Sequence, residues 1–302
     1  MRTPFGGIKH SGIGREGGVH RFANYSVIIN IHYQIMIKGR IEMVVNLIEW
    51  STKFIEAEKT GKGIDPPSKV LPGINEREAY QIQLETINRK QELGQKITGK
   101  KIGLTSTAMQ RLLGVDEPDY GHLLNGMELG NNAVISKKSV IQPKVEAEIA
   151  FVLKKDLKGP NVTAEDVLDA TDYLVASIEV VDSRVLDWKI TLPDTIADNA
   201  SSGLYILSDM HVSPSDINLS SIKMRLFQNG EFINEGKGED VLGNPASSVA
   251  WLVNKLHEFK ITVYKGEIIL SGALSAAIDA KSGDTFYADF GVILGGVSIH
   301  FE

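Results

Sequence analysis

Two glutamates, Glu146 and Glu148, stand one residue apart inside the apolar run PKVEAEIAF at residues 143–151. Alternate residues of a β-strand point to the same face of a sheet, so this spacing predicts two carboxylates side by side. Where water is excluded from such a pair, one carboxylate must take up a proton or a cation must bind between them. A strand with one solvated face has the same alternating pattern, and the segment by itself favours that simpler interpretation.

A third acid, Glu179, stands in the run YLVASIEVVDSR at residues 173–184. A strand that is buried on both faces reads as a nearly continuous apolar run, and an ionised glutamate in that setting needs a partner. Arg184, at the end of the run, is one candidate partner. A divalent cation shared with the other two glutamates is the alternative, because Mg²⁺ takes oxygen ligands and Mn²⁺ accepts the same set.

Other kinds of catalytic site find little support in the sequence. The chain has no cysteine, which excludes thiol nucleophiles, disulfides and zinc–thiolate centres. Its histidines never occur at the spacing of paired metal ligands, and no G-x-S-x-G or P-loop motif is found. Residues 12–17, GIGREG, match the dinucleotide pattern, but we expect no cofactor there because that motif needs a preceding strand. An oxygen-ligated metal is the best chemical candidate.

Composition indicates a soluble globular protein. Hydrophobic residues make up 42% of the 302 residues and charged residues 23%, which is enough for a packed core in one large domain or two ordinary ones. The net charge is −6 without a basic block, so nucleic acid is not an expected partner. The apolar stretch at residues 25–37 is too short to cross a membrane and carries polar side chains. We expect a cytoplasmic protein.

The elements that must position these residues form an α+β pattern. Helical spacing begins at residue 43, and predicted helix starts carry caps at Asn75, Thr163 and Asn244. After residue 99 the period shortens to that of strands, and Asn229-Gly230 predicts a hairpin. We therefore expect a helical N-terminal cap at residues 43–98 and a β-rich catalytic domain at residues 99–302.

Residues 1–42 look foreign to the rest of the chain. The stretch TPFGGIKHSGIGREGG and the following FANYSVIINI, within residues 1–35, resemble the C-terminal tail of an aldehyde dehydrogenase. None of the catalytic machinery of that family accompanies them. We interpret residues 1–42 as an N-terminal extension fused to the domain that follows.

Several ordered motifs between residues 99 and 302 resemble the 2-keto-4-pentenoate (2-hydroxypenta-2,4-dienoate) hydratases of the fumarylacetoacetate hydrolase-like superfamily. They are KIGLTSTAMQRLLGVDEPDYGHL, PKVEAEIAFVL, EVVDSRVLDWKITLPDTIADNASSG, LGNPASSVAWLVNKL and LSGALSAA. The resemblance implies a mixed β-roll or sandwich with flanking helices, assembled as a homo-oligomer. It also implies that Glu146, Glu148 and Glu179 bind Mg²⁺ or Mn²⁺.

The same resemblance implies roles for three further residues. Lys101, in the KIGLT motif, would bind the carboxylate or enolate of the substrate. Asp119, in DEPDYG, would transfer protons, and Ser201, in DNASSG, would contact the substrate or water. Judged on local sequence alone, a strand lysine that reaches toward solvent, a loop-capping aspartate and a turn serine are the simpler interpretations.

The implied activity is the metal-dependent addition of water to 2-hydroxypenta-2,4-dienoate, a small dienoate, to give 4-hydroxy-2-oxopentanoate in meta-cleavage degradation of aromatic compounds. 4-Oxalocrotonate decarboxylase shares most motifs and is the nearest alternative. A 2-oxohept-4-ene-1,7-dioate hydratase is another alternative. The second carboxylate of its substrate requires an extra cation in the cavity, which the sequence does not locate. A non-catalytic protein that binds 2-oxo acids is the alternative of a different class.

Overall fold

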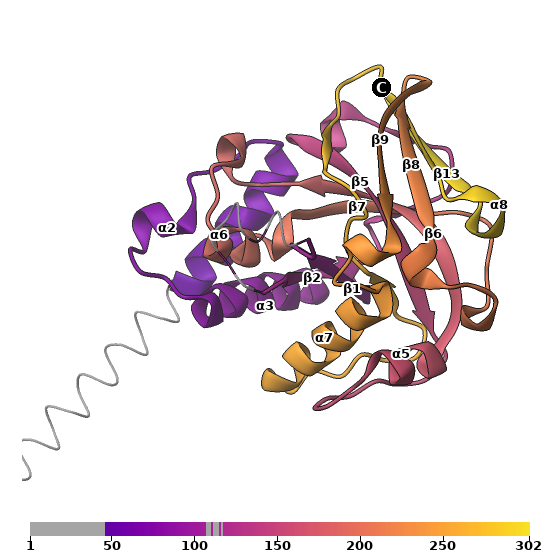
Figure 1. Ribbon diagram of the computed structural model, residues 1–302. Coiled ribbons are helices and arrows are strands. Elements are labelled where there is room, and N and C mark those ends of the chain that lie inside the picture. The colour runs from indigo at the N-terminus through magenta and orange to yellow at the C-terminus, as the bar shows by residue number, and fades with distance from the viewer. Residues whose placement is uncertain (1–45, 107–109, 111–114, 116) are drawn as a thin grey trace, which may run out of the picture. The chain divides into compact units, whose positions relative to one another are not determined.

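Figure 1 shows the computed structural model, which describes residues 46–106, 110, 115 and 117–302. The predicted N-terminal extension, residues 1–42, lies outside the described residues, as does the start of the helix predicted from residue 43. The chain divides into two compact units, Met1–Glu49 and Trp50–Glu302. All the strands and the site described below belong to the second unit.

Two β-sheets form the centre of this unit (Figure 1). In the described chain the larger sheet has eight strands in the order β2-β1-β10-β5-β6-β7-β3, with β11 paired to β5 outside that path. Its strands are β1 Ile97–Gly103, β2 Asp119–Leu124, β3 Glu128–Leu129, β5 Pro143–Leu153, β6 Thr171–Asp182, β7 Ser202–Leu207, β10 Ile268–Leu270 and β11 Ile278–Asp279. Parallel and antiparallel pairs coexist, since β1 pairs with β10 in parallel and β5 with β6 antiparallel.

The smaller sheet has five described strands in the order β4-β13-β12-β8-β9. They are β4 Ala133–Ile135, β8 Lys223–Gln228, β9 Glu231–Lys237, β12 Thr285–Asp289 and β13 Gly296–Phe301. The predicted hairpin is confirmed: Asn229 and Gly230 join β8 to β9 with φ angles of 54° and 83°, which is the left-handed conformation that a two-residue hairpin turn requires.

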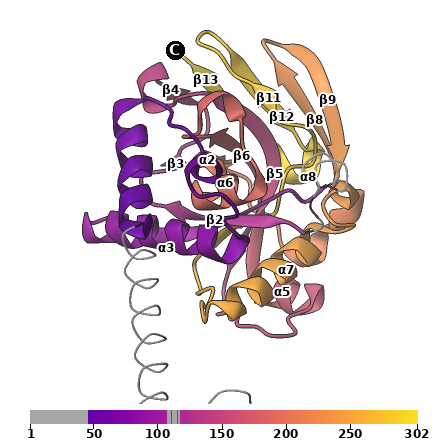
Figure 2. The same ribbon diagram turned by 90° about the vertical axis from the view of Figure 1, so that its left-hand side faces the viewer.

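Helices flank the sheets, as Figure 2 shows from the side. One spans residues 46–60, and the others are α2 Pro67–Val70, α3 Glu76–Glu92, α5 Ala164–Ala170, α6 Leu192–Ala197, α7 Pro245–Glu258 and α8 Gly291–Leu294. The three predicted caps are confirmed, at Asn75, Thr163 and Asn244. No helix in the described chain is long and apolar enough to cross a membrane. The predicted α+β class is confirmed.

Helix α3 carries one polar side chain into the core of the unit. Gln83 is buried, and its Nε2 atom donates to the carbonyl oxygens of Tyr120 at 2.9 Å and Ile196 at 2.8 Å. It thereby ties α3 to strand β2 and to helix α6, which lies against α3 in Figures 1 and 2. Both of these elements reach the candidate site, so α3 fixes the outer side of that site.

Candidate active site

The three glutamates picked out by the sequence come together. Each offers one carboxylate oxygen, and these oxygens all lie within 4.8 Å of one another. Glu146 and Glu148 are alternate residues of β5, as predicted, and Glu179 of β6 lies directly opposite Glu146 in the antiparallel register. The strand period and the register therefore place all three side chains on one face of the sheet.

The burial of this cluster excludes the interpretation of a solvent-facing strand. Glu148 is 0% exposed and Glu179 is 1% exposed. One oxygen of Glu148, Oε2, accepts a hydrogen bond from the backbone nitrogen of Gly272 at 2.7 Å. The other oxygen of Glu148 and Oε1 of Glu179 accept no hydrogen bond from the described residues, and Oε2 of Glu179 has only the ion pair with Lys101 that is described below. Buried polar atoms are rarely left without a partner, so these oxygens require an explanation.

The electrostatics of the cluster favour the binding of a cation. Burial raises the pKa of Glu146 to about 7, although Lys101 opposes the shift. Burial also raises the pKa of Glu148, and the neighbouring Glu179 and Glu146 carboxylates raise it further. A hard divalent cation would accept the unpartnered oxygens as ligands and would offset the repulsion between the carboxylates. The donor set therefore fits Mg²⁺ or Mn²⁺.

Lys101 is the cation that approaches the cluster from the chain itself. Its Nζ atom lies 3.4 Å from Glu179 Oε2, and its side chain is 4% exposed. Strands β1 and β6 are separated in the sheet by β10 and β5, so this contact requires a strongly curled sheet. Burial by itself would lower the pKa of Lys101, but Glu179, Asp119 and the other two glutamates raise it above its ordinary value. Lys101 is therefore a permanent cation.

Asp119 lies at the first position of β2, opposite Gly103 of β1. It is therefore a strand residue and not the loop-capping aspartate of the simpler interpretation. A Cβ atom on Gly103 would lie 2.2 Å from Asp119 Oδ1, so glycine is required for the carboxylate to approach. Thr195 Oγ1 donates to Asp119 Oδ2 at 3.4 Å. Burial raises the pKa of Asp119, and Lys101 partly opposes this.

Ser201 belongs to a strained turn at the edge of the site. Asn199, Ala200 and Ser201 have φ angles of 56°, 49° and 52°, a left-handed conformation that costs non-glycine residues free energy and is concentrated at functional sites. Ser201 Oγ donates to Asp198 Oδ2 at 3.2 Å. Its hydroxyl is thus held by the carboxylate that precedes the turn, while the residue lines the candidate cavity.

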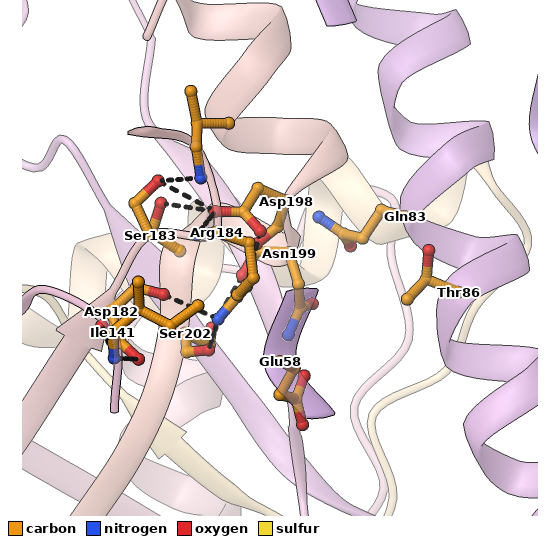
Figure 3. Close-up of polar contacts among 12 residues, drawn as sticks. Glu58, Gln83, Thr86, Ile141, Asp182, Ser183, Arg184, Asp198, Asn199 and Ser202 are labelled. Carbon is orange, nitrogen blue, oxygen red and sulfur yellow. Dashed lines mark hydrogen bonds and ion pairs between the residues drawn. The ribbon is translucent and has the colours of Figure 1, made fainter. Parts of the chain in front are cut away.

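A buried network, drawn in Figure 3, holds this turn. Arg184 Nε donates to Asp198 Oδ1 at 2.5 Å, and the backbone nitrogen of Arg184 donates to Asp198 Oδ2 at 2.9 Å. The guanidinium also donates to the carbonyl oxygens of Asp182 and Ser202. Arg184 therefore pairs with Asp198 and not with Glu179, so the interpretation of Arg184 as the partner of Glu179 is wrong. Sequence reasoning missed Asp198, whose only signal was its place in the polar run ADNASSG.

Asn199 connects the turn to strand β2. Its Oδ1 accepts from the backbone nitrogen of His122 at 2.7 Å, and its Nδ2 donates to the His122 carbonyl oxygen at 2.9 Å. The strand and the turn approach closely, because a Cβ atom on Gly121 would lie 2.3 Å from the Asn199 carbonyl oxygen. The strand that begins with Asp119 and the turn that ends with Ser201 are thus locked together.

These side chains surround one cavity of about 910 Å³. Lys101, Asp119, Glu146 and Ser201 line it, while Glu148 and Glu179 are buried beside Glu146. The sequence did not single out the other lining residues, which include the apolar Val181, Trp188, Ile190, Leu242 and Leu274 and the charged Lys144, Glu239 and Asp240. All six predicted site residues therefore lie in or next to one cavity, which is lined by both apolar and charged side chains.

Comparison with known proteins identifies the family. Residues 113–296 match the family described as fumarylacetoacetate (FAA) hydrolase C-terminal. A 2-hydroxyhexa-2,4-dienoate hydratase from Comamonas testosteroni is 42% identical over 236 residues, which cover 78% of this chain and 89% of that protein. A 2-keto-4-pentenoate hydratase from Paraburkholderia xenovorans is 41% identical over 254 residues, which cover 84% of this chain and 94% of that protein.

A solved structure supports the same placement. The 4-oxalocrotonate decarboxylase from Pseudomonas putida G7, complexed with magnesium and adipate, is 34% identical with a TM-score of 0.83, and the match covers 85% of this chain and 97% of that chain. The predicted fumarylacetoacetate hydrolase-like fold is confirmed. The chain belongs to the 2-keto-4-pentenoate hydratase family of the fumarylacetoacetate hydrolase-like superfamily.

Proposed function

We propose that the protein is a metal-dependent hydratase that adds water to 2-hydroxypenta-2,4-dienoate and forms 4-hydroxy-2-oxopentanoate. The observation that carries the proposal is the meeting of three carboxylates beside one cavity, with buried oxygens that lack hydrogen-bond donors. The names of the relatives, which are dienoate and pentenoate hydratases, supply the substrate class.

The metal would be held by Glu146, Glu148 and Glu179, whose oxygens are the hard ligands that Mg²⁺ and Mn²⁺ prefer. When bound, the ion supplies Lewis-acid stabilisation of the negative charge that builds up on a substrate oxygen. The solved decarboxylase is complexed with magnesium, which supports Mg²⁺ as the first choice.

Lys101 binds the anionic end of the substrate. The lysine is buried, permanently charged and on the wall of the cavity, so it offers an ammonium group in a site with little competing water. A charge-assisted hydrogen bond to a carboxylate or enolate oxygen is about twice as strong as a neutral one. Lys101 therefore positions the substrate with its 2-oxygen toward the glutamates.

Asp119 moves the protons. The reaction first converts the dienol into an α,β-unsaturated ketone, so the hydroxyl proton leaves and carbon 5 gains a proton. Water then adds across the resulting double bond between carbons 3 and 4, placing its hydroxyl on carbon 4 and a proton on carbon 3. Asp119 lines the cavity, and burial raises its pKa above the ordinary value, which is the direction that helps a carboxyl group both to accept and to donate a proton. Ser201, at the same cavity, orients the attacking water.

The apolar wall holds the hydrocarbon end of the substrate. Trp188, Ile190 and Leu274 line the cavity, and apolar contacts with them would exclude bulk water from the unsaturated carbons of the substrate.

Decarboxylation of 4-oxalocrotonate is the second candidate, favoured by the TM-score of 0.83 to a decarboxylase. Metal-loaded full-length protein, incubated separately with 2-hydroxypenta-2,4-dienoate and with 4-oxalocrotonate, distinguishes the two by NMR of the products. We expect 4-hydroxy-2-oxopentanoate from the first substrate. Release of CO₂ from the second, without any hydroxylated product from the first, would overturn the proposal.

Two further expectations, one from the composition and one from the family, stay predictions. We expect the enzyme to act in the cytoplasm and to assemble as a homo-oligomer. Light scattering of the purified protein measures its mass in solution, and a monomer at micromolar concentration would contradict the second expectation.

A further inference from the structure

The cavity holds a second lysine that the proposed reaction does not use. Lys144 precedes Glu146 by two residues on β5, so its side chain points to the same face, about 6.7 Å further along the strand. It lines the cavity, and its side chain is 27% exposed. Lys144 therefore lies in the same cavity as Lys101, at a position that the far end of a longer substrate could reach.

The charge of Lys144 is already paired from outside the cavity. Lys144 lies opposite Asp279 where β11 pairs with β5, and its Nζ atom donates a short hydrogen bond to the Asp279 carboxylate. Directly opposite residues of antiparallel strands interact most closely, so the register enforces the pair. The ammonium also lies 5.4 Å from the centre of the Trp188 ring.

The remaining charges on the cavity wall do not favour a second anion. Among the described residues that line it, Lys101 and Lys144 are the only cations, and Lys101 is paired with Glu179. Glu239 and Asp240 also line the cavity. A second substrate carboxylate would therefore leave water for a wall on which like charges are close and the lysine within reach is already occupied.

We infer that the Lys144–Asp279 pair makes the site select substrates with an uncharged chain end over dicarboxylates. Asp279, whose side chain is 73% exposed, competes with a second substrate carboxylate for Lys144. The inference rests on the proposed function, because it concerns the far end of the same substrate cavity. Lys144 is thus the extra cation that a dicarboxylate substrate would require, and its pair with Asp279 makes it less available to that substrate.

The test compares two substrates on metal-loaded full-length protein, 2-hydroxypenta-2,4-dienoate and 2-hydroxyhepta-2,4-diene-1,7-dioate. We expect the wild type to prefer the monocarboxylate. Asp279→Asn removes the charge with little change of shape and frees Lys144, which should raise kcat/KM for the dicarboxylate about fivefold, mainly through KM. The gain should shrink at high salt because a partly exposed charge is screened.

Two variants serve as controls. Asp169→Asn removes an exposed aspartate from a similar pair with Lys155 and should leave the ratio of the two kcat/KM values unchanged. Adding Lys144→Gln to Asp279→Asn should abolish the gain, because the freed cation is then absent. A gain that survives in this double variant would overturn the inference.

The possible outcomes distinguish a failure of the inference from a failure of the proposed function. If the wild type hydrates the monocarboxylate but Asp279→Asn leaves the substrate ratio unchanged, the inference fails and the proposed function stands. A wild type that prefers the dicarboxylate overturns the inference and favours the dioate hydratase alternative over the proposed substrate. If the wild type hydrates neither substrate with Mg²⁺ or Mn²⁺, the proposed function fails and the inference falls with it.

Discussion

Replacing Asp198 by asparagine tests how the strained turn at the cavity is held. The carboxylate is 0% exposed in its side chain. Its Oδ2 atom accepts from the backbone nitrogen of Arg184 and from the hydroxyls of Ser183 and Ser201, and its Oδ1 atom accepts from Arg184 Nε. An amide oxygen can replace only one of these acceptors. The amide NH₂ group must then face either the guanidinium or three donors.

The expected cost follows from this geometry. One charge-assisted hydrogen bond is lost, worth about 1.5–3 kcal/mol, and the guanidinium of Arg184 stays buried without its counter-charge. Breaking a buried ion pair by neutralising one partner costs about 3–5 kcal/mol, which is a large share of a domain stability of about 5–15 kcal/mol. We expect Asp198→Asn to lower the free energy of unfolding by about 3–5 kcal/mol. Urea denaturation followed by tryptophan fluorescence measures this change.

The catalytic activity of Asp198→Asn should show the effect on the turn at residues 199–201 independently of the loss of stability. At a temperature where Asp198→Asn remains folded, the released turn should lower kcat/KM, because Ala200 and Ser201 line the cavity. Affinity for Mn²⁺ should stay within about threefold of wild type, since the three glutamates lie on β5 and β6. Asp169→Asn, an exposed control, should cost less than about 1 kcal/mol. An Asp198→Asn protein as stable and as active as the wild type would refute this account of the network.

Three further predictions concern single residues. Asp119→Asn should lower kcat about a hundredfold with Mn²⁺ affinity nearly unchanged, as measured by steady-state kinetics and metal titration; unchanged turnover would remove Asp119 from the mechanism. Gly121→Ala should cost about 1–3 kcal/mol in urea denaturation, because its Cβ atom would lie 2.3 Å from the Asn199 carbonyl oxygen; a neutral effect would contradict that close approach. The metal-free protein should lose stability as the pH rises from 4.5 through 7, because the folded pKa of Glu146, about 7, lies above its ordinary value of 4.5. Thermal melts with and without Mn²⁺ check this, and a pH-independent melting temperature of the metal-free protein would disagree.

Local patterns in the sequence were enough for some parts of the site. The alternation of Glu146 and Glu148 is a property of one strand, so their shared face could be predicted from spacing. The capping box at Asn75 and the Asn229-Gly230 hairpin are equally local, since each depends on neighbouring residues only. These features needed no knowledge of the tertiary structure.

Features that depend on contacts between distant parts of the chain could not be predicted in the same way. Glu179 lies opposite Glu146 only because of the register between β5 and β6, and register is fixed by packing across the whole sheet. Strand β2, with polar residues at Asp119 and His122, lacks a clear strand pattern. It is held by the side chain of Asn199 from far along the chain. The family resemblance supplied Lys101, whose contact with Glu179 requires the curl of the sheet.

The proposed role of Lys144 and Asp279 in substrate specificity could not be predicted from the sequence either. They are separated by 135 positions in the chain, and each is an ordinary surface charge in the sequence. Only the pairing of β11 with β5 brings them together beside the cavity. The proposal for the far end of the substrate therefore required the structure, whereas the glutamates of the proposed metal site could be predicted from motifs.

The measurement that tests the central claim most directly is a Mn²⁺ titration of the metal-free full-length protein, followed by electron paramagnetic resonance. We predict one ion per chain, and at least about tenfold weaker binding in each of Glu146→Gln, Glu148→Gln and Glu179→Gln. Glu231→Gln, a change at an exposed strand glutamate, should bind like the wild type. If the three cluster variants bind Mn²⁺ as tightly as the wild type does, the glutamate cluster is not the metal site and the proposed mechanism is wrong.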